Sequence, residues 1–231
     1  MSYLPYVDAN TTALRSGVLH RVYAWMTAGL LVTGAVAMFV AGNDALMAAI
    51  FGNSLVFFGL IIAELALVWI LSANIGRLPV ATATGMFLGY SALNGLTMAA
   101  IFWVYTSASI ASTFFITAGT FGAMSAYGYF TKRDLSGMGN FLFMALIGLI
   151  IASVVNIFWA NSALYWIISF AGVLIFVALT AYDTQKIKRL AAQVSDEGGA
   201  GRVAILGALT LYLDFINLFL FLLRFLGARR D

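Results

Sequence analysis

Acidic side chains inside apolar segments are the residues of this sequence best suited to chemistry. Glu64, Asp183 and Asp214 each lie within or at the end of a long apolar stretch. A charged side chain at the centre of a bilayer costs about 3 kcal/mol on insertion scales, so such groups usually face the interior of a helix bundle or a water-filled cavity. These three residues are therefore the first candidates for a functional site.

Asp214 stands out because it lies near the middle of its apolar segment. About eleven residues separate it from either end, which is about 16 Å of helix. Interfacial water does not easily explain a carboxyl group at that depth. Asn217 follows three residues later, on the same face of the helix. We predict a functional or proton-relay role for Asp214, with Asn217 as a supporting polar group.

The other two acidic residues also have simpler interpretations. Glu64 can be an interhelical hydrogen-bonding group, either protonated or paired with Arg77 or an amide. Asp183 is followed by the polar run at 184–186, so it can end its helix in contact with water. Amide side chains such as Asn217 are also common hydrogen-bonding groups between membrane helices.

Two motifs near the end of the chain resemble the paired motifs of the transmembrane Bax-inhibitor-motif family. They are Ala181–Ile187 (AYDTQKI) and Leu211–Phe219 (LYLDFINLF). Earlier segments are similar to the bacterial members of that family: Val22–Met26, Gly29–Leu30, Glu64–Leu65, Gly89–Tyr90 and Asn94–Gly95. The resemblance covers almost the whole chain, and its last two motifs are the specific ones.

The resemblance implies a seven-helix bundle whose last helix is central and enclosed by the other six. It also implies a pH-sensitive calcium leak in which Asp183 and Asp214 form a pair that senses pH, gates the path and can bind Ca²⁺. An arginine latches this pair in the family, and Arg77 is a candidate for that role here. Family members are further linked to cell-death suppression and to restraint of membrane proteases, so a membrane protease is a candidate partner.

The chemistry of such a pair follows from electrostatics. Two carboxylates at hydrogen-bonding distance in a low dielectric cannot both ionise cheaply, so they share a proton, and their titration belongs to the pair. The protonated pair can hold two helices together, whereas the deprotonated pair repels and offers oxygen ligands that suit Ca²⁺. Acid therefore favours a closed form, and higher pH favours opening.

The elements that must position these residues are membrane helices. Of the 231 residues, 63% are hydrophobic and 9% are charged, against about 25% charged residues in soluble domains. So few polar groups cannot cover the surface of a soluble fold, whereas lipid accepts apolar side chains on the outside. We predict a single transmembrane domain over residues 1–231, with residues 1–20 as a cytoplasmic N-terminal segment rather than a cleaved signal peptide.

The predicted class is an all-α membrane protein. A spanning helix needs about 20 mostly apolar residues. This rule predicts seven spans, at Val22–Ala41, Leu55–Ala73, Val80–Trp103, Ile110–Phe130, Phe141–Trp159, Leu164–Asp183 and Val203–Phe225.

Charge placement predicts the orientation of these spans. Lys and Arg occur before the first span and in alternate connections, at Arg15, Arg21, Arg77, Lys132, Arg133, Lys186, Lys188, Arg189 and Arg202. The positive-inside rule then makes the N-terminus cytoplasmic. Seven spans leave the C-terminus outside despite Arg224, Arg229 and Arg230, and we predict that the last helix crosses because it is long enough.

The predicted segments place the two aspartates at different depths. Asp183 falls near the cytoplasmic surface and Asp214 near the middle of the membrane. Pairing them requires the last helix to start earlier than the predicted span, with cytoplasmic turns before Leu206, and the connection from Thr184 to Arg202 is long enough to allow it.

Several classes of function have no support in the sequence. The chain has no cysteine, and its one histidine, His20, cannot form a histidine-rich metal site. We therefore predict no cofactor. It has no long basic run, so no nucleic-acid partner is expected. No nucleophile–base motif occurs, so an enzyme is not expected, although an intramembrane protease with an acidic pair stays open.

The leading interpretation is a pH-gated cation leak channel, with Ca²⁺ as the ion, in a bacterial inner membrane. One alternative is an interaction protein that modulates a membrane protease or a quality-control complex, in which the aspartates are structural. Another is a proton-coupled transporter of small solutes, because buried Asn and Asp side chains suit that function as well.

Overall fold

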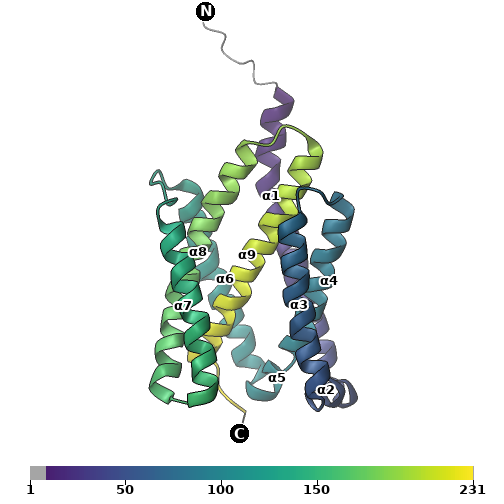
Figure 1. Cartoon of the computed structure of the whole chain (residues 1–231), viewed down its shortest axis with the longest axis vertical. Coiled ribbons are helices and arrows are strands. Elements are labelled where there is room, and N and C mark those ends of the chain that lie inside the picture. Colours follow the sequence, from purple (N-terminus) through teal and green to yellow (C-terminus); the bar gives the residue numbers. More distant parts are fainter. Residues whose placement is uncertain (1–8, 231) are drawn as a thin grey trace, which may run out of the picture. The chain divides into compact units, whose positions relative to one another are not determined.

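The computed structural model describes the backbone of residues 9–230 and the side chains of residues 17–230. In the predicted N-terminal segment 1–20, the backbone of residues 1–8 and the side chains of residues 1–16, including that of Arg15, lie outside the described residues. The regular structure of the described chain is helical (Figure 1). The helices are α1 (Ala9–Ala41), α2 (Asp44–Phe51), α3 (Ser54–Asn74), α4 (Val80–Met98), α5 (Ile101–Val104), α6 (Ser107–Phe130), α7 (Met138–Trp159), α8 (Ser162–Ala192) and α9 (Glu197–Leu226).

Six stretches of these helices are long and apolar enough to cross a membrane: Gly17–Ala41, Ser54–Asn74, Val80–Val104, Met138–Trp159, Ser162–Ala192 and Glu197–Leu226. They correspond to six of the seven predicted spans. The remaining prediction, Ile110–Phe130, forms α6, which has 24 residues. Its serine and threonine side chains lower its hydropathy, so α6 has the length of a span without the same apolar character.

The last two helices are longer than predicted, and this removes the difference in depth between the aspartates. α8 continues to Ala192 rather than ending at Asp183, and α9 begins at Glu197 rather than at Val203. The predicted connection from Thr184 to Arg202 was therefore wrong, because residues 193–196 suffice to join the two helices. Lys and Arg end an apolar segment but are good helix formers, so the helix continues beyond the end of the apolar segment.

The chain divides into two compact units. Unit 1 comprises residues 1–99 and 187–209, and unit 2 comprises residues 100–186 and 210–231. The long helices α8 and α9 each contribute to both units, so neither unit is one continuous stretch of sequence. The single transmembrane domain stays a prediction.

Unit 1 contains a close contact between α1 and α4. A Cβ atom on Gly29 would lie 2.6 Å from the ring of Phe87, and one on Gly95 would lie 2.8 Å from the carbonyl oxygen of Thr33. The Thr33 hydroxyl also donates a hydrogen bond of 2.8 Å to the carbonyl oxygen of Ser91. Small residues let membrane helices approach in this way.

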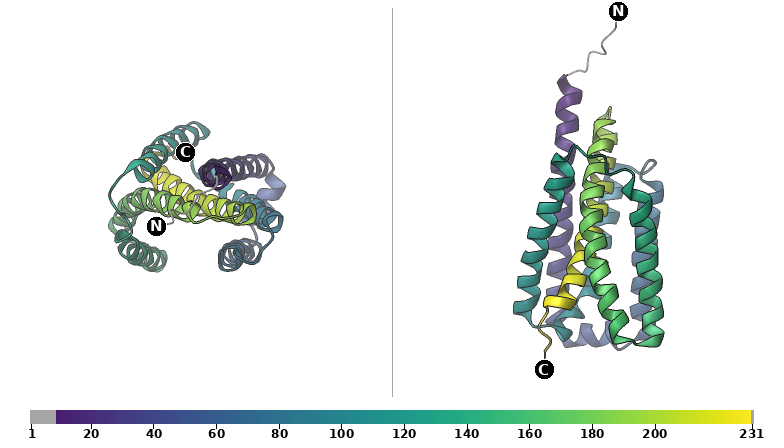
Figure 2. Two further views of the ribbon diagram at one scale, coloured as in Figure 1. Left: turned by 90° about the horizontal axis from the view of Figure 1, so that it is seen from above. Right: turned by 90° about the vertical axis from the view of Figure 1, so that its left-hand side faces the viewer.

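Unit 2 contains α5, α6, α7, most of α8 and the C-terminal half of α9. α7 and α8 are antiparallel neighbours, joined by a turn at residues 160–161 (Figure 2). α9 is the most buried candidate span: 67% of its most apolar 18-residue stretch is buried, against 6% for α3. Phe215 of α9 packs edge-on against Phe114 and Phe121 of α6, with ring centroids 5.3 Å and 5.5 Å apart.

The C-terminal tail is bound at one end of unit 2. Arg229 pairs with Tyr105 in an antiparallel bridge, and the backbone N–H of Thr106 donates to the carbonyl of Ala228 at 3.0 Å. The Arg230 guanidinium donates to the carbonyl of Phe102 at 2.9 Å. We call this the outer end of unit 2, because the connections at 105–106 and 160–161 contain no Lys or Arg.

Candidate functional site

The structure brings Asp183 of α8 and Asp214 of α9 together within unit 2. Their carboxyl groups are within hydrogen-bonding reach of each other. Both residues are buried, with 6% and 4% of their surface exposed. The Asp214 Oδ2 atom is buried and has no hydrogen-bond partner among the described residues. The two motifs that carry the family resemblance therefore contribute one carboxyl group each to a single buried site.

Lys186, a cation beside this site in the described part of the chain, is weakly placed. The Lys186 ammonium lies 4.0 Å from the Asp183 Oδ1 atom, and 53% of the Lys186 side chain is exposed. An exposed ion pair contributes little, typically less than about 1 kcal/mol. Lys186 therefore does not compensate two negative charges in so buried a place, and full ionisation of both carboxyl groups would be costly.

Residues around Asp183 fix α8 against α6 and the loop that follows it. Gln185 accepts a hydrogen bond from the backbone N–H of Leu135 at 2.9 Å and donates one to the carbonyl of Arg133 at 2.8 Å. A Cβ atom on Gly128 of α6 would overlap the backbone of Ala181. These contacts set the rotation of α8, and the rotation points Asp183 into unit 2.

Gln185 and Gly128 were not predicted as site residues. Gln185 is buried and lies two positions after Asp183 within the specific motif, so its position in the sequence was an available signal. Gly128 was visible only as one glycine among 22, because its role depends on a close approach between two helices that sequence spacing does not show.

Comparison with known proteins identifies the chain. The family described as inhibitor of apoptosis-promoting Bax1 matches residues 15–231. The inner membrane protein YbhL of Escherichia coli is 58% identical over 212 residues, which cover 91% of each chain. A protein of Borreliella burgdorferi is 46% identical, over 94% of each chain. A protein of Deinococcus radiodurans is also 46% identical, over 91% of this chain and 90% of its own length.

The chain belongs to the Bax inhibitor-1 family. The family resemblance predicted from its motifs is therefore confirmed. It is a multi-pass inner membrane protein, like YbhL. The matched region includes both aspartates, so the buried pair is part of the family domain rather than an addition to it.

Glu64 occupies a different environment in this Bax inhibitor-1 family member. In unit 1, the Thr97 hydroxyl donates to the Glu64 Oε1 atom at 2.8 Å, and the Asn94 amide reaches Oε2 at 3.5 Å. Of the alternatives considered for Glu64, the structure shows a contact with an amide, and it adds a hydroxyl that was not predicted. Arg77 is exposed in the turn after α3, and its role as a latch stays a prediction.

Asn217 is half-buried, and its amide donates to the carbonyl of Leu213 at 2.8 Å, within its own helix. The described residues contain no group of three or more His, Cys, Asp or Glu side chains that could hold a metal ion. Two carboxyl groups supply at most four of the six to eight oxygen ligands that Ca²⁺ takes. The two aspartates alone therefore cannot complete the coordination shell of a Ca²⁺ ion.

Proposed function

We propose that this Bax inhibitor-1 family member is a pH-sensitive cation leak channel, with Ca²⁺ as the permeant ion and Asp183 and Asp214 as its gate. The observation that carries the proposal is the buried carboxyl pair: two different helices meet at two acids, and the adjacent cation Lys186 is exposed. A channel of this kind needs no catalytic group, so we propose that the protein is not an enzyme.

The proton shared by the pair is the gating element in this proposal. With one proton present, the two carboxyl groups hydrogen-bond and hold α8 against α9. Without it, two negative charges about 4 Å apart repel by about 4 kcal/mol at an effective dielectric of 20. Since about 1.4 kcal/mol changes an equilibrium tenfold, loss of the proton shifts a closed–open equilibrium by several hundredfold.

The sign of the pH dependence follows from that proton. Acid keeps the pair protonated and the helices together, so leak is low. As pH rises, the pair loses its proton, the helices separate and the carboxylates become available to a passing cation. The hard oxygen ligands favour Ca²⁺ over softer metals, and too few of them are present to retain it.

The proposal includes a seven-span bundle with α9 at its centre. α6 is the seventh span, because several of its polar groups point inward: Thr113, Thr117 and Ser125 are buried, whereas Phe115 and Phe130 are exposed. The face of α6 that would meet lipid is therefore more apolar than the whole helix. The high burial of α9 supports its central position.

Calcium flux into proteoliposomes tests the channel. Vesicles that contain the purified full-length protein should take up Ca²⁺ faster at pH 8 than at pH 6. Asp214→Asn should keep the low, acid-type rate at both values, because an amide pairs with Asp183 without generating repulsion. Glu64→Gln is the matched control, since it neutralises an acid in another helix and should leave the pH dependence intact. Equal leak from wild-type and Asp214→Asn vesicles at every pH would remove the channel from consideration.

A further inference from the structure

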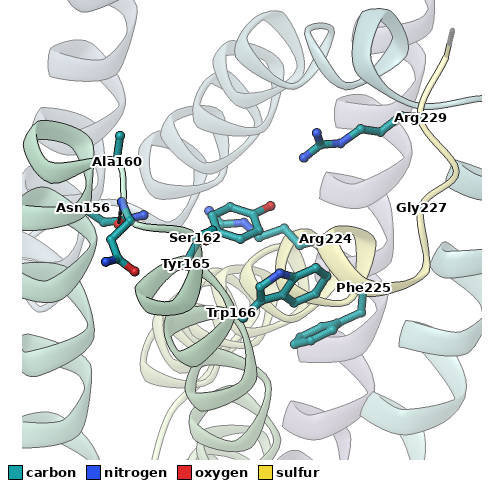
Figure 3. Close-up of a pocket in the computed structure, with 10 residues that line it drawn as sticks. Asn156, Ala160, Ser162, Tyr165, Trp166, Arg224, Phe225, Gly227 and Arg229 are labelled. Carbon is teal, nitrogen blue, oxygen red and sulfur yellow. Dashed lines mark hydrogen bonds between the residues drawn. The ribbon is translucent and has the colours of Figure 1, made fainter.

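A second polar site lies at the outer end of unit 2, away from the aspartate pair. An open cavity of about 600 Å³ lies where α7 ends, α8 begins and α9 ends (Figure 3). Its polar and aromatic lining includes Asn156, Asn161, Tyr165, Trp166, Arg224 and Arg229. All of these residues belong to unit 2.

The charge of this cavity is positive. Arg224 and Arg229 line it, and the acidic residues described in unit 2, which are Asp134, Asp183 and Asp214, do not. Arg224 is half-buried and held in place, because its guanidinium lies 5.3 Å from the ring centroid of Tyr165 and 4.9 Å from that of Phe221. Two cations on one cavity, without a described carboxylate to pair with, suit a negatively charged partner.

The two asparagine side chains of the cavity supply hydrogen-bond donors. The Asn156 Oδ1 atom accepts from the backbone N–H of Asn161 at 3.1 Å, and the Asn161 Oδ1 atom accepts from that of Leu164 at 3.0 Å. Both amide oxygens are thus used within the turn, and both Nδ2 groups are left to donate. The turn itself is fixed, since Ala160 has a left-handed backbone with φ of 44°.

The N-terminus of α8 adds to the positive electrostatic potential of the cavity. Its first backbone N–H groups, at Ser162 and Ala163, have no partner within the helix, and Ser162 lines the cavity. The positive end of the macrodipole of a 31-residue helix lies at the same place. Two guanidinium groups, two amide donors and a helix N-terminus therefore surround a space without a described carboxylate.

We infer that this cavity binds a phosphate group, carried either by the headgroup of an anionic phospholipid or by a small soluble phosphate. Guanidinium groups bind phosphate oxygens through paired, charge-assisted hydrogen bonds, which fits two arginines on one cavity. Its position at the end of three helices matches the depth of a lipid headgroup. Trp166, Ile167 and Phe170 of α8 are exposed beside it, with 50%, 64% and 62% of their surface accessible, and can contact acyl chains.

Binding of defined lipids to the purified full-length protein tests this inference. Native mass spectrometry of delipidated protein should detect phosphatidylglycerol bound more tightly than phosphatidylcholine, whose choline cation would face the arginines. Arg224→Gln with Arg229→Gln should weaken phosphatidylglycerol about a hundredfold, since each arginine makes charge-assisted bonds worth about a tenfold change. Lys132→Gln with Arg133→Gln is the control, because it removes two exposed cations of unit 2 outside the cavity and should leave binding unchanged.

A second arm identifies the source of the phosphate. Glycerol 1-phosphate titrated into the same protein by calorimetry should bind weakly if the lipid is the occupant. Micromolar binding that depends on Arg224 and Arg229 would instead assign the cavity to a soluble phosphate. Equal phosphatidylglycerol affinity in the double variant and its control would overturn the inference. If the double variant does not fold, Arg229→Gln alone is measured, because Arg229 is exposed in the tail and its replacement should not disturb folding. Phosphatidylglycerol binding about tenfold weaker in this variant supports the site, and unchanged binding overturns it.

Discussion

The two units each bury an acidic side chain in an apolar helix, and they treat it differently. In unit 1, Glu64 is half-buried and receives hydrogen bonds from Thr97 and Asn94. In unit 2, Asp214 is almost fully buried and faces a second acid, Asp183. Neutral donors satisfy a carboxylate without changing their own charge. A second acid satisfies it only while a proton is shared. We therefore propose that Asp183 and Asp214 form the pH-sensitive site and that Glu64 is structural.

Removing Gln185 should have the largest effect among the supporting residues. Gln185→Ala removes two hydrogen bonds and leaves the N–H of the buried residue Leu135 without a partner, so unfolding should become easier by about 3 kcal/mol. The same change should loosen the position of Asp183 and reduce the pH dependence of Ca²⁺ leak. Thermal unfolding in detergent and vesicle flux measure the two effects.

Gln193→Ala serves as the control for that experiment, since Gln193 is exposed just after the end of α8. It should change neither stability nor leak. A Gln185→Ala protein with unaltered stability and an unaltered pH profile would show that the contacts with the loop after α6 do not position the aspartate pair.

Removing Glu64 should have an intermediate effect on stability and none on gating. Glu64→Ala removes the carboxylate that accepts from the Asn94 amide and the Thr97 hydroxyl, although the hydroxyl can still donate to the carbonyl of Asn94. It should lower the free energy of unfolding by about 1–2 kcal/mol. Glu64→Gln keeps an acceptor oxygen and should cost less. Loss of the pH dependence of leak in either variant would contradict the distinction between the two acidic sites.

Replacing Lys186 should have the smallest effect. Its ammonium contacts Asp183 at 4.0 Å and is largely exposed, so Lys186→Gln should change stability by less than about 1 kcal/mol. A nearby cation favours ionised carboxyl groups. Without it, the onset of leak should move to higher pH by less than one unit. Lys188→Gln, which removes an exposed charge two residues later, should not move the onset, and a shift toward lower pH in Lys186→Gln would contradict this assignment.

The existence of the helices could be predicted from the sequence, but their limits could not all be predicted. Apolar runs of about 20 residues indicated where the membrane segments lie. They did not reveal that α8 continues past Asp183 for nine residues to Ala192, because hydropathy measures transfer into lipid and not helix formation. Nor did they anticipate α2, a short helix begun by the Asn43 cap within a connection.

The candidate site was only partly predictable. Asp214 was identifiable from its depth in an apolar segment, whereas its pairing with Asp183 depended on the family resemblance. The role of Gln185 and the close contact at Gly128 depend on how α6 and α8 meet. Such contacts join residues that are 50 or more positions apart, and the spacing within one segment carries no information about them.

The measurement that tests the central claim most directly is infrared spectroscopy of the aspartate pair across pH, performed on the same proteoliposomes used for Ca²⁺ flux. The shared proton predicts a protonated carboxyl band that disappears as pH rises, over the same range in which leak increases. Asp214→Asn should remove both changes and Glu64→Gln neither. If that band disappears without any change in leak, or if leak rises while the band persists, the aspartate pair is not the gate.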